Sequence, residues 1–166
     1  MRTDTPTEWD ERSTLMALLH YVRNTVARKC EGLSDELARQ APLPASPLTT
    51  VSGLVSHLRW VEHWWFESRF LGLENRTPES DDDPDYEMTI GLSVPLSRLL
   101  EEYAEQCRVC DAVIAEHPLD QRAVHPVSTG DHPTLRWIIL HLIEETARHN
   151  GHIDIIRETV DGTTGD

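Results

Sequence analysis

Residues 145–152 read Glu-Thr-Ala-Arg-His-Asn-Gly-His and lie inside a longer helical pattern. Apolar residues on both sides of this stretch are spaced three or four positions from its polar residues or from each other: Ile138, Leu142 and Ile156. Such steps mark the buried face of an amphipathic helix that packs against other helices. Glu145, His149 and His152 continue the same steps. The pattern therefore predicts a packed helix with polar side chains on its buried face.

Polar side chains on a buried face need partners, because an unpaired polar group costs roughly 2–7 kcal/mol and a bare charge costs more. One explanation is a divalent metal ion that takes the carboxylate and the imidazoles as ligands. The other is a buried pair between Glu145 and His149, with the remaining histidine hydrogen-bonded to its surroundings. Spacing alone leaves both explanations open.

Helix geometry narrows the possible ligand pairs. Glu145 and His149 lie roughly 40° and 6 Å apart, so both can reach one ion, as ligand pairs at this spacing do in helical zinc sites. His149 and His152 are also close enough to share an ion. Glu145 and His152 are about 10.5 Å apart along the axis, so one ion is not expected to take all three. Either pair needs a further ligand from another helix. His141, one turn before Glu145, is a weaker candidate ligand on the same helix.

A second amphipathic helix, expected at about residues 50–71, offers that ligand. Its apolar face steps by three and four through Leu54, His57, Val61 and Trp64. His57 therefore faces the core, whereas His63 falls on a different face and is expected at a helix edge or in solvent. If the two helices pack side by side, His57 can complete a site with Glu145 and His149.

Two further long helices are expected, which gives four ranges in all: residues 8–30, 50–71, 93–117 and 134–160. Gly32 and Gly162 end the first and the last of these helices. The acidic stretch 79–87 is expected to be a solvated loop. The pattern predicts an all-α fold, a four-helix bundle in which the long connections after the second and third helices are crossover loops. Residues 1–166 are expected to form a single domain.

Composition excludes several classes of partner. The 166 residues include 15 basic and 29 acidic side chains, and the formal net charge is -14. This charge disfavours nucleic acids and anionic membranes as partners. The sequence shows no signal peptide and no apolar run approaching membrane-spanning length, so a soluble cytoplasmic protein, monomer or homodimer, is expected. Cys107 and Cys110 form a C-x-x-C pair inside a predicted helix, which favours a structural role over a redox role.

Two segments carry a resemblance to a known family. Residues 53–62 (GLVSHLRWVE) and the pattern E-x-x-x-H-x-G-H-x-D-x-x-R-E at residues 145–158 resemble the DinB-like superfamily, and within it the mini-circle-protein branch. The resemblance covers essentially the whole chain. It implies a four-helix bundle and a divalent metal held by His57, Glu145 and His149. It also implies that His152 contacts a ligand from outside, without binding the metal, or faces the substrate. Many members have histidine at the position of Glu145, but the metal-dependent mycothiol maleylpyruvate isomerases of the superfamily have glutamate there.

The resemblance implies a metal-dependent thiol transferase or isomerase. Its cofactors would be Zn²⁺ or Ni²⁺ and mycothiol or a related low-molecular-weight thiol, and its second partner an electrophilic substrate. Two imidazoles and one carboxylate leave open metal positions, as catalytic sites do, and a thiol bound there would lose its proton. A metal-dependent hydrolase and a non-catalytic metal-binding stress protein are the alternatives, because the same ligands also suit water activation.

Overall fold

The structure is a computed structural model that describes residues 3–165. Its long helices are α1 (Glu11–Lys29), α3 (Val51–His63), α5 (Leu96–Glu116) and α6 (Leu135–Asp161). Short helices lie between them: α2 (Asp35–Ala38), α4 (Tyr86–Thr89), the π-helix η1 (Trp64–Phe70) that continues α3, and the 3-10 helix η2 (Ile90–Ser93). Residues 3–165 contain one isolated β-bridge and no strand, so the predicted all-α fold is confirmed.

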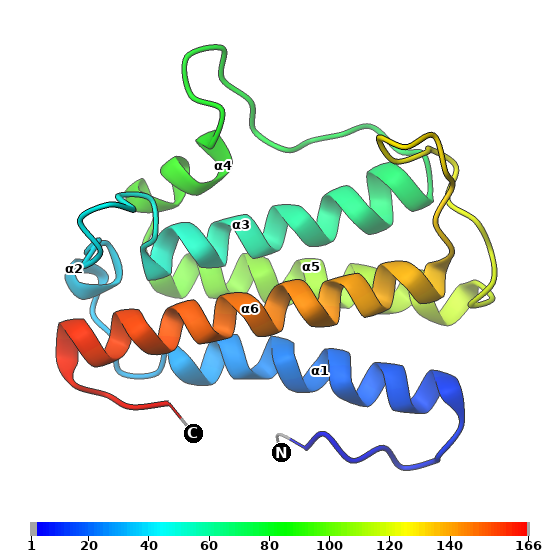
Figure 1. The fold of residues 1–166 in the computed structure, drawn as a ribbon, viewed down its shortest axis with the longest axis horizontal. Helices are drawn as coiled ribbons and strands as arrows, with labels where there is room; N and C mark the ends of the chain where they lie inside the picture. Colours follow the sequence, from blue (N-terminus) through cyan, green and yellow to red (C-terminus); the bar gives the residue numbers. More distant parts are fainter. Residues whose placement is uncertain (1–2, 166) are drawn as a thin grey trace.

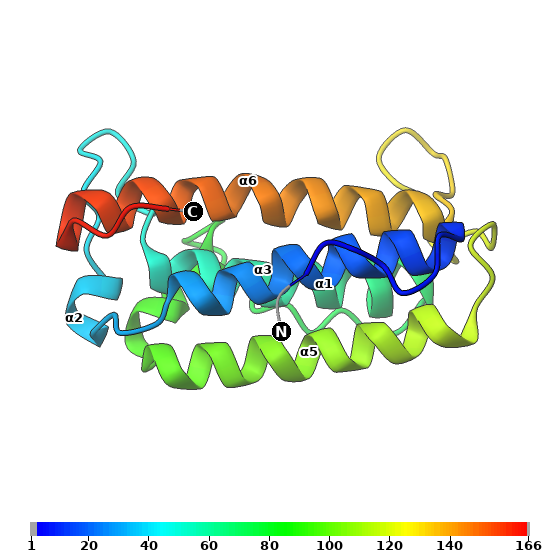
Figure 2. The ribbon, with the colours of Figure 1, turned by 90° about the horizontal axis from the view of Figure 1, so that it is seen from below.

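The four long helices lie side by side as a bundle (Figure 1). In both views α1 and α6 run in one direction and α3 and α5 in the other (Figures 1 and 2). The two long connections differ: the predicted crossover is confirmed for the first, and the prediction was wrong for the second. Residues 71–85 run back along the length of the bundle, so that α3 and α5 are parallel, whereas residues 117–134 stay at one end and join two antiparallel helices. The return of the first connection is what brings α4 against α3.

Side-chain caps fix the beginnings of three of the four long helices. The side chains of Asp10, Thr50 and Thr134 each accept a hydrogen bond from the backbone N–H three residues on. Such caps satisfy an N–H group that has no partner inside the helix. The cap at Asp10 places the start of α1 at Glu11, three residues after the expected position. Gly162 follows α6 with a φ of 76°, a left-handed conformation that glycine adopts without steric cost.

The core has two apolar clusters, one toward each end of the bundle. The first includes Phe66, Phe70, Ile138 and Leu142. The second includes Leu54, Leu58, Ile153 and Ile156. On α6 the residues Glu145 and His149 therefore lie between Leu142 of one cluster and Ile153 of the other. The polar stretch that interrupts the seam occupies the middle of the bundle, where α6 packs against α3.

The expectation for His63 was wrong, because its side chain is completely buried. Helix α3 contacts α5, α6, α4 and η2, so little of its surface remains free. The Nε2 atom of His63 accepts a hydrogen bond from the backbone N–H of Arg76 at 3.0 Å, and its Nδ1 lies 2.8 Å from Oε1 of Glu67. His63 thus ties the start of the long connection to α3.

The cysteines are held as inert thiols. Cys110 is buried, and burial raises the pKa of the Cys107 thiol to about 12. A thiol in that state supplies almost no thiolate at neutral pH, which supports the structural role predicted for the C-x-x-C pair. Within residues 3–165 no helix is both long enough and apolar enough to cross a bilayer.

Candidate metal centre

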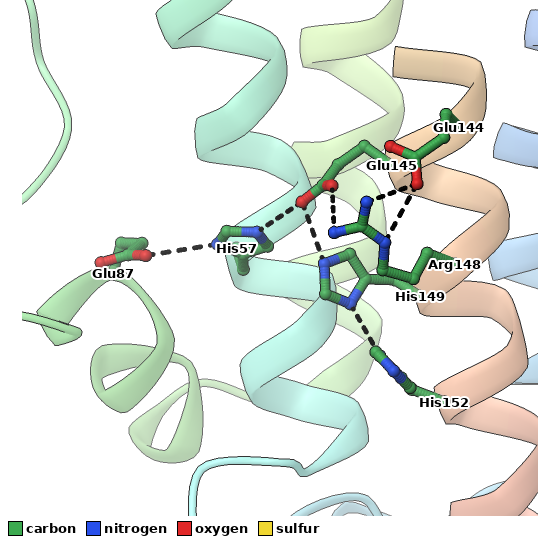
Figure 3. A network of polar contacts seen from close by, with 7 residues as sticks. All are labelled: His57, Glu87, Glu144, Glu145, Arg148, His149 and His152. Carbon is green, nitrogen blue, oxygen red and sulfur yellow. Dashed lines mark hydrogen bonds and ion pairs between the residues drawn. The ribbon is translucent and has the colours of Figure 1, made fainter. Parts of the chain in front are cut away.

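Three side chains from two helices converge at the middle of the bundle. His57 comes from α3, and Glu145 and His149 come from α6; one donor atom of each lies within 4.8 Å of those of the other two. The Oε1 atom of Glu145 is 3.4 Å from Nε2 of His57 and 3.1 Å from Nε2 of His149. Figure 3 shows both imidazoles turned toward this oxygen. Within residues 3–165 this is the one group of three such donors that could hold an ion.

The distances suit a shared ion. Two donors that each lie about 2.1 Å from one metal are about 3.0 Å apart at a right angle and about 3.4 Å apart at a tetrahedral angle. The separations of 3.4 and 3.1 Å between Glu145 and the two imidazole nitrogens fall in or close to that interval. All three side chains are mostly but not fully buried, so the group keeps some contact with solvent.

Glu87 orients His57 from the opposite side. Its Oε1 lies 3.2 Å from Nδ1 of His57, on the far side of the ring from Glu145 (Figure 3). A carboxylate that accepts the Nδ1 proton leaves the Nε2 lone pair free for a metal, as outer carboxylates do at many histidine-ligated sites. The acidic composition of residues 79–87 predicted a solvated loop that includes residue 87. That expectation was wrong for Glu87, which belongs to α4 and is half-buried against α3.

Close packing holds α4 and η2 in place. The hydroxyl of Ser56 donates a hydrogen bond of 2.5 Å to the backbone carbonyl of Glu87. Gly91 lies so close to α3 that a Cβ there would be 2.7 Å from the carbonyl oxygen of Ser52. The approach requires glycine, because contacts under about 3 Å are essentially never tolerated by a real Cβ.

His149 has a second imidazole as its outer neighbour. The Nδ1 atoms of His149 and His152 are 3.2 Å apart, so one ring donates a hydrogen bond to the other. Arg148 approaches the other carboxylate oxygen of Glu145, with Nη1 at 3.4 Å from Oε2. His141 lies outside the group and stacks on Trp137 at a ring-centroid distance of 5.0 Å.

Local electrostatics give Glu145 and His149 the charges that a metal requires. Burial acts to raise the pKa of Glu145, but His149 and His57 outweigh it and hold that pKa below its ordinary value. Burial, with the neighbouring His57, lowers the pKa of His149. The carboxylate is therefore anionic and the His149 ring neutral near pH 7, which are the ligating forms of both groups.

A pocket of about 590 Å³ opens beside His57. Helices α3 and η1 form one wall, and the long connection with the start of α4 forms the other. Its apolar lining includes the indoles Trp60, Trp64 and Trp65. The volume lies in the range of small-molecule sites in proteins.

The fold and these motifs place the chain in the DinB-like class of helical bundles. A family model described as mycothiol-S-transferase matches residues 14–162. The chain belongs to the mycothiol-S-transferase family. No curated protein matches the sequence.

Proposed function

We propose that the protein is a metal-dependent mycothiol S-transferase in which His57, Glu145 and His149 hold one divalent cation. The observation that carries the proposal is the convergence of these three donors beside a pocket. Two imidazoles and one carboxylate suit Zn²⁺ or Ni²⁺ and leave at least one position open. Membership of the family supports mycothiol as the thiol.

A metal held by these residues would lower the pKa of a thiol and keep it as thiolate at neutral pH. Glu87 and His152 contact the outer nitrogens of His57 and His149, which fixes both rings with Nε2 toward the centre. A substrate is the better source of the reactive sulfur, because burial raises the pKa of all three cysteine thiols, to about 12 for Cys30 and Cys107. Transfer forms a bond between that sulfur and an electrophilic carbon, and the displaced group leaves with the electron pair of the broken bond.

An isomerase would use the same thiolate by adding it to the substrate and later releasing it. A hydrolase would use the same donors to activate water. The family match favours thiol chemistry over water chemistry, and the remaining alternative is a bundle that holds a metal without turnover. Metal content and thiol binding, measured separately, distinguish thiol chemistry from the hydrolase and non-catalytic alternatives.

The first test measures metal in protein purified without a metal-affinity tag. Elemental analysis is expected to find about one zinc or nickel per chain, because the site offers one set of three ligands. His57→Ala should lose the metal and keep the helical circular dichroism spectrum. His141→Ala is the matched control, since His141 lies on α6 outside the group, and it should keep the metal. Full metal content in His57→Ala would contradict the ligand assignment.

The second test replaces the metal with Co²⁺ and adds mycothiol. A sulfur-to-cobalt charge-transfer band is expected, and it should disappear at roughly pH 5 because protonated histidines do not ligate metals. Calorimetry in buffers of different ionisation enthalpy should detect the proton that the thiol releases. Mycothiol binding that is unchanged in the metal-free protein would refute the transferase proposal. Metal without thiol binding would indicate a hydrolase or a non-catalytic protein.

A further inference from the structure

One wall of the pocket beside His57 carries carboxylates that form no ion pair with a lysine or an arginine in the part of the chain that the structure describes. Glu79, Asp81, Asp83 and Glu87 line it, and no lysine or arginine does. Within residues 3–165, none of these four carboxylates lies at ion-pair distance from a lysine or an arginine. Glu87 alone among them contacts a titratable basic side chain of the described residues, the imidazole of His57. Elsewhere the chain pairs its carboxylates readily, as Arg76 with Glu67 and Arg59 with Glu102 show.

The opposite wall is aromatic. Trp60 and Trp64 are partly exposed. Trp65 also lines the pocket but is buried, with its ring centroid 4.7 Å from that of Trp64. Arg59 and Arg69 lie over the rings of Trp60 and Trp64 at 4.0 and 4.3 Å, but neither arginine lines the pocket. Indole faces attract cations and flat apolar groups.

We propose that this pocket binds the electrophilic substrate and selects a cationic one, an ammonium or iminium group attached to a flat apolar body, over carboxylate-bearing electrophiles. The inference rests on the proposed function, because it places the second substrate beside the thiol. An anion would meet like charge along one wall and no guanidinium or ammonium group to pair with. A cation gains attraction from the carboxylates and from the indole rings, and a flat body covers the tryptophans.

The position of His57 links the pocket to the metal centre. One edge of its ring faces Glu145 and the other faces Glu87, which itself lines the pocket (Figure 3). A substrate between the tryptophans and the acidic wall therefore lies beside His57, the proposed ligand that lines the pocket. Since a thiolate is an anion, its charge adds to the attraction for a positively charged electrophile.

The test compares three small probes of similar shape: benzylammonium, benzyl alcohol and benzoate. Binding to the full chain is followed by NMR through the indole N–H resonances, both as purified and after treatment with a chelator. Benzylammonium should shift the resonances of Trp60 and Trp64 and leave that of Trp9, which is 80% exposed and outside the pocket, in place. Its affinity should exceed that of benzoate by about tenfold or more, because each exposed charge pair contributes roughly two- to fivefold.

Two triple variants with the same change in net charge separate the pocket from the overall charge of the chain. Glu79→Gln/Asp81→Asn/Asp83→Asn removes three pocket carboxylates and should lower benzylammonium affinity by about tenfold. Glu74→Gln/Asp82→Asn/Asp85→Asn removes three carboxylates of the same segment that do not line the pocket, and its effect should stay within about twofold. Trp60→Leu should also weaken the ammonium probe.

Several results would overturn the inference. These are benzoate or benzyl alcohol binding as tightly as benzylammonium, equal effects of the two triple variants, or the absence of shifts at Trp60 and Trp64. Neither metal nor thiol is needed for the measurement. A failed charge preference therefore leaves the metal and thiol results standing, and a protein without metal can still show the preference, so the two proposals fail separately.

Discussion

Among single residues, Glu87 has the most direct effect on the proposed ligands, because it holds the ring of His57 from outside. We expect Glu87→Ala to weaken Zn²⁺ binding by roughly 10–100-fold, the usual effect of removing an outer hydrogen-bond partner of a ligand. Glu87→Gln keeps an acceptor oxygen and should lose less. Competition with a chromophoric chelator measures both affinities.

The matched control is Glu144→Gln. Glu144 lies next to Glu145 on α6, but its carboxylate pairs with Arg148 and does not contact His57. The zinc affinity of the Glu144→Gln variant should stay close to that of the unchanged protein. Equal affinities in Glu87→Ala, Glu87→Gln and the control would show that His57 is oriented without Glu87.

Glu67 gives a prediction about acid stability. Burial acts to raise its pKa, but hydrogen bonds from His63 and Gln106 and the charge of Arg76 outweigh burial and lower the pKa below 4.5. A depressed carboxyl pKa contributes stability above the unfolded-state value, and that contribution is lost as pH falls through the folded-state pKa. Glu67→Gln should therefore destabilise the protein at pH 7 by about 1–3 kcal/mol.

Urea denaturation at several pH values checks this. The difference in free energy of unfolding between the unchanged protein and Glu67→Gln should be constant from pH 7 to about pH 5 and shrink below about pH 4.5. A difference that does not change with pH would mean that the charge of Glu67 contributes nothing.

Among the elements, α4 and η2 matter most for the site, because they bring Glu87 to His57. Gly91→Ala should separate η2 from α3, since the new methyl group would lie 2.7 Å from the Ser52 carbonyl oxygen and 2.8 Å from Cβ of Ser56. We expect a loss of about 1–3 kcal/mol of stability, typical of overpacking. Zinc affinity should fall together with stability, because Glu87 lies on α4, which η2 directly continues.

Gly151→Ala is the control for this substitution. Gly151 lies inside α6, and a Cβ there would meet nothing within 4 Å. Alanine in an open helical position should stabilise the protein by about 0.5–1 kcal/mol. Thermal unfolding and zinc titration of both variants separate the two effects. An unchanged zinc affinity in Gly91→Ala would show that α4 does not depend on this contact.

Across the whole molecule, Arg23 joins three long helices through two ion pairs. Arg23 of α1 donates to both carboxylate oxygens of Glu62 on α3, at 2.6 and 2.5 Å, and to Asp111 on α5 at 2.7 Å. Arg23 is 5% exposed and Glu62 is fully buried. Arg23→Met should destabilise the bundle by about 3–5 kcal/mol, because it leaves the Glu62 charge buried without its partner.

The double variant Arg23→Met/Glu62→Leu should recover most of that loss, since apolar pairs of similar size often replace buried ion pairs at little cost. Chemical denaturation of both single variants and the double variant completes the cycle. Simple additivity of the two single effects would show that the residues contribute independently.

The sequence by itself determined the helices and the local part of the site. Periodicity and capping residues depend on neighbours a few positions away, so the four long helices were predicted to within a few residues at most ends. The spacing of Glu145 and His149 is likewise set by one helix. His57 was a candidate from its own periodicity, and the resemblance to the DinB-like superfamily selected it.

Only the tertiary structure decided the surroundings of that site. Glu87 contacts His57 because the connection after α3 returns along the bundle. A crossover was predicted there, but no local pattern in residues 79–87 indicates that Glu87 would meet His57. His63 is buried because α3 is covered on several sides, which one helix's periodicity does not reveal. The ion pair of Arg23 with Glu62 and the two walls of the pocket likewise join segments far apart in the chain. Such contacts depend on how the elements pack, and the sequence of each element alone does not specify that packing.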